Sequence, residues 1–121
     1  MTPITSSAQD YLERICEVIS QKGYARVSDL AEKLSVSPAS VTNMVKKLET
    51  EGYLVREAYR GFTLTKKGKK IGENIAHRHQ VLPTILQSLD LPQHIIDHDI
   101  EGLEHHISDE TLAALEKYLG I

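Results

Sequence analysis

Carboxylate and imidazole side chains stand at helical spacing toward the C-terminal end of the chain. Glu101, Glu104 and His105 occupy positions i, i+3 and i+4, so on a helix they share one face and could bind one cation together. His79 could supply a fourth donor. Oxygen-rich sets with some imidazole suit hard or borderline divalent ions such as manganese and iron(II), so this pattern indicates a metal site.

A second carboxylate pair, Asp10 and Glu13, lies near the other end of the chain. Its i and i+3 spacing also predicts a shared helix face, but spacing alone cannot bring the pair to Glu101. Structural roles stay open for these residues: Asp10 as the partner of Ser7 in a capping box, and Glu13 as a solvated helix side chain. The single cysteine, Cys16, is expected to be a small core residue rather than a ligand.

Charge is unevenly distributed along the 121 residues. The net charge is −3, but residues 22–78 carry 12 basic against 6 acidic side chains, and residues 79–121 carry one basic against 8 acidic. A basic central segment is typical of a protein that binds a polyanion, although a solvated charged surface has the same composition. One cysteine excludes an intramolecular disulfide, no apolar run could span a membrane, and the N-terminus has no secretion signal, so we expect a cytoplasmic protein.

The hydrophobic period changes from helical to extended and back along the chain. Ser37 is a suitable N-cap with Pro38 in the first turn, Gly52 ends that helix, and Pro83 is expected to kink or interrupt a later one. The other expected caps are Ser7, Ser28, Thr65 and Ser108. The expected helices are 7–21, 27–34, 38–51, 66–89, 93–106 and 109–119, and the expected strands are 53–56 and 62–65.

Helix, short helix, three-residue turn, helix and hairpin is the element order of a winged helix-turn-helix, so the predicted fold is mainly α with a small β-hairpin wing. The helix after the turn would enter the major groove. There Val41, Met44, Val45 and Leu48 would face the core, and Asn43, which can pair with adenine, would face outward. The residues predicted to contact double-stranded DNA are Arg26, Ser37, Pro38, Ala39, Ser40, Thr42, Asn43, Lys46, Lys47, Arg56, Tyr59 and Arg60.

Several motifs, in order along the chain, resemble the diphtheria-toxin-repressor (DtxR) family, and most closely its manganese-responsive, MntR-type branch. The likeness covers nearly all of residues 8–110, and several motifs in register are far more specific than any one alone. The matching stretches are Asp10-Tyr-Leu-Glu13, Lys22-Gly-Tyr-Ala-Arg-Val-Ser-Asp-Leu-Ala, Ser37-Pro-Ala-Ser-Val-Thr, Tyr59-Arg-Gly, Lys67-Gly-Lys-Lys-Ile-Gly, Arg78-His79 and Ile100-Glu-Gly-Leu-Glu-His-His.

The resemblance implies a two-metal site. The iron-responsive branch has a Met at the position of Asp10 and a Cys at that of Glu101, so the oxygen donors here favour manganese over iron(II). The implied cofactor is Mn²⁺, two ions per subunit, with Fe²⁺, Co²⁺, Cd²⁺ or Zn²⁺ as substitutes. The implied metal ligands are Asp10, Glu13, His79, Glu101, Glu104 and His105.

The same resemblance implies a metal-dependent repressor of metal-uptake genes, not an enzyme, that binds a pseudo-palindromic operator as a homodimer. Residues 1–71 would form the winged helix-turn-helix domain and residues 72–121 a helical metal-binding and dimerisation domain. Within these 121 residues we expect neither the SH3-like third domain of the iron branch nor the further C-terminal helix of manganese regulators. The leucines that could pack across the dimer instead are Leu112, Leu115 and Leu119.

Three alternatives stay open. The chain could be a metal-independent winged-helix regulator, or an iron(II)-responsive repressor. It could also be a small metallohydrolase that uses the carboxylate and His cluster, but no nucleophile–base pair is visible and catalysis would leave the basic segment unexplained. No membrane and no organic substrate is expected as a partner.

Overall fold

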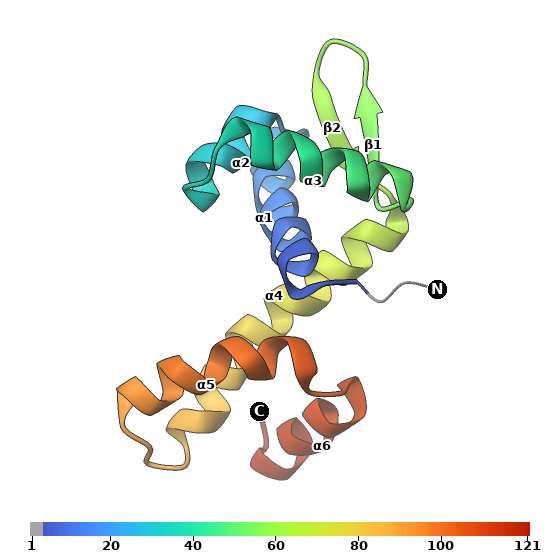
Figure 1. Ribbon diagram of the computed structural model, residues 1–121. Coiled ribbons are helices and arrows are strands. Elements are labelled where there is room, and N and C mark those ends of the chain that lie inside the picture. Colours follow the sequence, from blue (N-terminus) through green and yellow to red (C-terminus); the bar gives the residue numbers. More distant parts are fainter. Residues whose placement is uncertain (1–3) are drawn as a thin grey trace. The chain divides into compact units, whose positions relative to one another are not determined.

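The computed structural model describes residues 4–121, so Met1–Pro3, where the first predicted domain begins, lie outside the described residues. The chain divides into two compact units, one ending at Asn74 and the other spanning Ile75–Ile121. None of the described helices has the length and apolar character that a membrane crossing requires. The elements, labelled in Figure 1, are α1 (Ser6–Lys22), α2 (Val27–Leu34), α3 (Pro38–Thr50), β1 (Leu54–Glu57), β2 (Gly61–Leu64), α4 (Lys66–Gln87), α5 (Gln93–His106) and α6 (Asp109–Leu119).

The first unit is a winged helix-turn-helix built around one apolar core. Helices α1, α2 and α3 contribute Leu12, Ile15, Leu30 and Leu48, all fully buried, and the β1–β2 hairpin follows α3 as the wing. Together with the helical second unit, this arrangement confirms the predicted fold class, mainly α with a small β-hairpin.

Helix N-caps were largely predictable from hydroxyl residues. The side chains of Ser37, Thr65 and Ser108 each accept a hydrogen bond from the backbone N–H three residues later, at 3.1–3.2 Å, which confirms three predicted caps. Each bond satisfies one of the N–H groups that a helix leaves without an internal partner.

Two predicted caps were wrong. Helix α1 is capped by Thr5, whose Oγ1 accepts a backbone hydrogen bond at 3.1 Å, and α2 is preceded by Arg26, whose N–H donates to Asp29 Oδ2 at 2.9 Å. Thr5 and Arg26 have the extended backbone that a cap needs, with ψ of 158° and 161°, whereas Ser7 and Ser28 already lie inside helices. The capping box proposed for Ser7 and Asp10 is therefore absent.

The wing is joined to the segment before α2. Strands β1 and β2 pair antiparallel, with Glu57 opposite Gly61, and β1 begins one residue later and β2 one residue earlier than predicted. Ala25 adds a further bridge: its N–H donates to the Phe62 carbonyl at 2.9 Å, and the Phe62 N–H donates to the Ala25 carbonyl at 2.8 Å. This pairing anchors the hairpin at its second strand.

The second unit packs the end of α4 with α5 and α6 around Leu82, Ile85 and Leu112. Pro83 lies inside α4, yet the helix continues to Gln87, so of the expected kink or interruption the interruption does not occur. Proline cannot donate to the carbonyl of His79, four residues earlier, and this removes one helical hydrogen bond. The buried neighbours Leu82 and Ile85 hold the helix in place despite that loss.

The pKa of Asp29 predicts how stability depends on pH. Partial burial acts to raise that pKa, but hydrogen bonds from Lys22 Nζ, at 2.9 Å, and from the backbone N–H of Arg26 outweigh it and lower the pKa below its ordinary value. A carboxyl whose folded-state pKa is lowered stabilises the fold above its unfolded-state pKa, and that contribution is lost as the pH falls through the folded-state value.

We therefore expect the free energy of unfolding to decrease below about pH 4. Asp29→Asn should lower it at neutral pH by about 1 kcal/mol, the usual effect of weakening a helix cap, and should flatten its acid dependence. Urea denaturation at neutral and acidic pH measures both effects. An unchanged acid dependence in the variant would contradict this role for Asp29.

Candidate DNA interface and metal-binding residues

Helix α3 separates an apolar inward face from a polar outward face. Val41, Val45 and Leu48 are fully buried, and Met44 is half-buried against the same core. The outward residues at its N-terminal end are small, which lets the backbone of a recognition helix approach base edges closely. Of the residues predicted to read DNA, Ser37, Pro38, Ala39, Ser40, Asn43, Lys46 and Lys47 are exposed and Thr42 is half-buried.

The wing presents cations and one aromatic ring. Arg56 Nε donates to Glu49 Oε1 at 3.0 Å, and an amino group of Arg60 lies 3.2 Å from Glu57 Oε2. These ion pairs are exposed, so water screens them and a phosphate can compete for the guanidinium groups. Tyr59 stands fully exposed at the tip with a φ of +69°. The predicted DNA-contacting side chains of the wing are therefore accessible.

The first two predicted metal ligands lie on α1, in the first unit. Asp10 is half-buried, and Glu13 is only 4% exposed. The same helix buries Leu12 and Ile15 in the core of the winged helix-turn-helix. The helix that carries these carboxylates is thus part of the structural support of α3.

The other four predicted ligands lie in the second unit, on α4 and α5. His79 Nδ1 lies 2.6 Å from Glu104 Oε1, so the structure brings these two ligands into direct contact. An ionised carboxylate can only accept, so a neutral His79 donates from Nδ1 and keeps the Nε2 lone pair for another partner. Glu101 is exposed, and His105 is half-buried on the same helix.

Buried charge is concentrated at the predicted metal ligands. Across residues 4–121, the buried charged side chains are Glu13, Arg78 and Glu104. Carboxylates are almost never buried without compensation, and both buried carboxylates lie at predicted ligand positions. Within neither unit do the described residues gather three or more His, Cys, Asp or Glu side chains that could hold a metal ion. The predicted set is divided, with two ligands in the first unit and four in the second.

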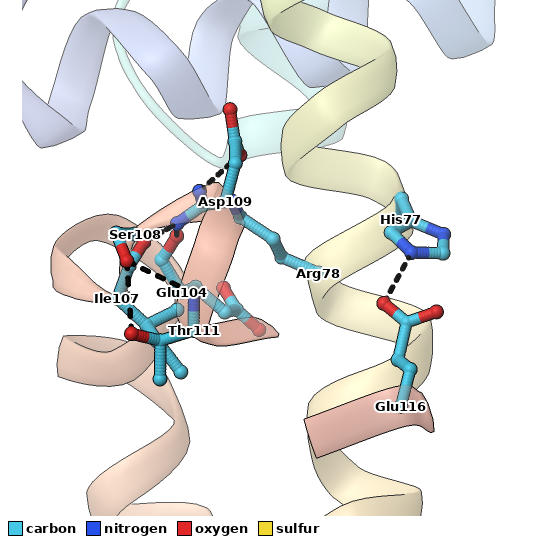
Figure 2. Close-up of polar contacts among 8 residues, drawn as sticks. All are labelled: His77, Arg78, Glu104, Ile107, Ser108, Asp109, Thr111 and Glu116. Atoms are coloured by element: carbon cyan, nitrogen blue, oxygen red, sulfur yellow. Dashed lines mark hydrogen bonds and ion pairs between the residues drawn. The ribbon is translucent and has the colours of Figure 1, made fainter. Parts of the chain in front are cut away.

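Arg78 is a buried residue to which the sequence pattern assigned no role. Its guanidinium donates to the Glu104 carbonyl at 3.2 Å, to the Ile107 carbonyl, and to Asp109 Oδ1 at 2.6 Å, as Figure 2 shows. These bonds satisfy carbonyls at the end of α5 and join that end to the start of α6. Arg78, the residue before His79 on α4, therefore binds the backbone of Glu104 directly. No sequence signal could reveal this, because two partners are carbonyls 26 and 29 residues away.

Cys16 is half-buried on α1, and its Sγ lies 3.9 Å from the Lys69 carbonyl. Burial, with a smaller contribution from Glu73, raises the pKa of the Cys16 thiol to about 11. The thiol therefore stays protonated at neutral pH and is a poor metal ligand or nucleophile. This agrees with the packing role expected from the sequence.

Comparison with protein families identifies both halves of the chain. The model described as iron-dependent repressor, N-terminal DNA-binding domain, matches residues 3–62, and the model described as iron-dependent repressor, metal-binding and dimerisation domain, matches residues 65–121. The chain belongs to the iron-dependent repressor family. The membership predicted from the sequence motifs is thereby confirmed.

Individual relatives agree with this membership. The chain is 54% identical over 104 residues to the HTH-type transcriptional regulator MntR of Geobacillus thermodenitrificans (strain NG80-2), covering 86% of this chain and 74% of that relative. It is similar to the solved structure of the metal-dependent transcriptional regulator MtsR, with 30% identity, a TM-score of 0.81 and coverage of 97% of this chain and 55% of that one. It is also similar to the solved structure of the manganese regulator SloR, with 33% identity, a TM-score of 0.76 and coverage of 99% of this chain and 55% of that one. The chain thus spans just over half the length of these two solved proteins.

Proposed function

We propose that this member of the family is a manganese-dependent repressor that acts in the cytoplasm, binds a pseudo-palindromic operator as a homodimer, and represses metal-uptake genes. The proposal is supported by the outward face of α3, by the cations of the wing, and by similarity to a solved structure named as a manganese regulator. Residues 1–71 would bind DNA, and residues 72–121 would contribute to metal binding and dimerisation.

The observation that carries the metal part of the proposal is the burial of two carboxylates. Glu13 and Glu104, one in each unit, are 4% and 6% exposed. A buried carboxylate is costly unless it is hydrogen-bonded or paired, as Glu104 is with His79, and a bound divalent cation would compensate such charge further. The donors are oxygens and imidazoles without a thiolate, which suits manganese. The proposed ligands are Asp10, Glu13, His79, Glu101, Glu104 and His105, for two ions per subunit.

The protein's own groups would connect metal binding to the DNA-reading head. Bound cations would supply the positive charge that compensates the four carboxylates of the set. Glu104 orients the His79 ring through the Nδ1 hydrogen bond, and Arg78 holds the Glu104 backbone. Helix α1 carries Asp10 and Glu13 and also packs in the core beneath α3, so changes at α1 reach the recognition helix. Thermodynamic linkage then requires operator DNA to tighten metal binding by the same factor as metal tightens DNA binding.

Operator binding across a panel of divalent ions tests the proposal. A binding sequence is first selected from a random duplex library with the manganese-loaded protein, and its affinity is then measured by fluorescence anisotropy. We expect a chelator to lower the affinity by about 10- to 100-fold, the usual range of allosteric coupling, and Mn²⁺ to restore it.

Three outcomes would contradict this scheme. Equal operator affinity with chelator and with Mn²⁺ would indicate a metal-independent regulator. Restoration by Fe²⁺ but not by Mn²⁺ would indicate an iron-responsive repressor. Equal Mn²⁺ affinity with and without operator, measured by isothermal titration, would exclude the coupling.

A further inference from the structure

Three cationic side chains surround the ring of Tyr24 in the first unit. Lys22 Nζ lies 5.0 Å from the ring centroid, and the guanidinium carbons of Arg26 and Arg60 each lie 5.3 Å from it. Cations this close to an aromatic ring are attracted by its quadrupole. Tyr24 is thus a common platform for side chains from the end of α1, the start of α2 and the wing.

The backbone around this platform is fixed by several hydrogen bonds. The Ala25–Phe62 bridge joins the residue after Tyr24 to β2, and Arg26 Nε donates to the Arg60 carbonyl at 3.2 Å. A Cβ at Gly61 would lie only 2.2 Å from the Ala25 carbonyl oxygen, so the two segments approach as closely as glycine allows. The guanidinium of Arg26 is therefore fixed in the unliganded protein by two contacts, the hydrogen bond from its Nε and the cation–π contact with the Tyr24 ring.

The three cations differ in how far neighbouring carboxylates compensate them. Lys22 Nζ contacts both carboxylate oxygens of Asp29 at 2.9 Å, and Arg60 pairs with Glu57 at 3.2 Å. Among residues 4–121, Arg26 forms no salt bridge, although the Asp29 carboxylate interacts with it electrostatically at longer range, and its side chain is exposed. Its fork of amino groups is the geometry that binds a phosphate through two parallel hydrogen bonds.

We propose that Tyr24 is a positioning residue for a DNA-phosphate site formed by Arg26 and Arg60 where the wing meets α2. This inference rests on the proposed DNA binding and adds to it a residue that does not itself need to touch DNA. By holding both guanidinium groups over one ring, Tyr24 reduces the side-chain entropy that phosphate binding would otherwise cost. The position beside the wing favours a phosphate of the DNA backbone over free phosphate.

Replacement of Tyr24 tests the site in the full-length, manganese-loaded protein. Affinity for a short duplex of random sequence is measured by fluorescence anisotropy over a range of salt concentrations, with and without inorganic phosphate as competitor. We expect Tyr24→Leu to weaken binding by about three- to ten-fold, the combined effect of weak cation–π contacts, and Tyr24→Phe, which keeps the ring, to retain most of the affinity.

A double-mutant cycle separates positioning from general stability. Arg26→Gln should weaken binding and reduce the slope of log affinity against log salt by about 0.9, the value for one phosphate contact. When Arg26 is already replaced by Gln, Tyr24→Leu should reduce the DNA affinity little further. When Lys46 is replaced by Gln, Tyr24→Leu should reduce the DNA affinity as much as it does in the wild type. An equal effect of Tyr24→Leu in both backgrounds, or unchanged affinity in the single variant, would overturn the inference. If millimolar inorganic phosphate displaces the duplex, the site binds free phosphate and not a phosphate of the DNA backbone, which would also overturn the inference.

If the wild type does not bind duplex DNA at all, both this inference and the proposed function are overturned.

Discussion

We expect Glu104→Gln to lower the affinity for Mn²⁺ by at least about 100-fold and to abolish manganese-stimulated operator binding. The carboxylate is 6% exposed and contacts His79 Nδ1 at 2.6 Å, so the substitution removes a buried negative charge that contacts a second proposed ligand. The amide oxygen still accepts from His79, and no buried charge remains to be compensated. The metal-free variant should therefore be as stable as the wild type or more stable. Isothermal titration with Mn²⁺ and thermal unfolding without metal measure the two effects.

Two further variants show whether the loss is specific. Glu101→Ala removes an exposed side chain of the proposed ligand set and should also abolish the manganese response with little effect on the fold. Asn43→Ala changes the outward face of α3 and should weaken operator binding by about ten-fold while the Mn²⁺ affinity stays unchanged. If Glu104→Gln binds Mn²⁺ like the wild type, Glu104 is only the hydrogen-bond partner of His79 and the proposed set is wrong.

Features that depend on neighbouring residues in the sequence were the most predictable part of the fold. A hydroxyl residue, a proline and then apolar residues at helical spacing predicted both the start of α3 at Pro38 and its buried face of Val41, Val45 and Leu48, because a helix of fixed period leaves little choice of face. Pro83 was less predictable. A proline weakens a helix locally, but packing of Leu82 and Ile85 in the second unit decides whether the helix continues.

Contacts between distant segments could not be predicted from spacing. The pattern Glu101-x-x-Glu104-His105 indicated which side chains share a helix face, and the structure adds that Glu104 is the buried member and that His79 contacts it. Arg78 and Tyr24 have no such pattern, because their partners lie on other elements and include backbone carbonyls and neighbouring cations. Such partners carry no residue-type signature, so only three-dimensional placement reveals these roles.

Gly61→Ala is expected to destabilise the wing more than any other glycine-to-alanine change in the hairpin and its turns. Gly61 has a φ of +119°, where an L-residue is strained, and a Cβ would lie 2.2 Å from the Ala25 carbonyl oxygen and 3.0 Å from Arg26 Cγ. The oxygen cannot yield freely, because it accepts the Phe62 N–H at 2.8 Å. Strain and steric overlap together should lower the free energy of unfolding by about 3–4 kcal/mol, which urea denaturation measures.

Gly52→Ala provides a matched control for backbone strain. Its φ is +84°, but no atom lies within 4 Å of the added Cβ, so it should cost only about 1 kcal/mol. The difference between the two variants isolates the close approach of β2 to the segment before α2. Because that approach also places Arg26 beside Arg60, Gly61→Ala should weaken binding to random-sequence duplex DNA under conditions where the protein stays folded, and Gly52→Ala should not. Equal destabilisation by the two changes would show that the wing is not anchored through Ala25, and the proposed phosphate site would lose its structural support.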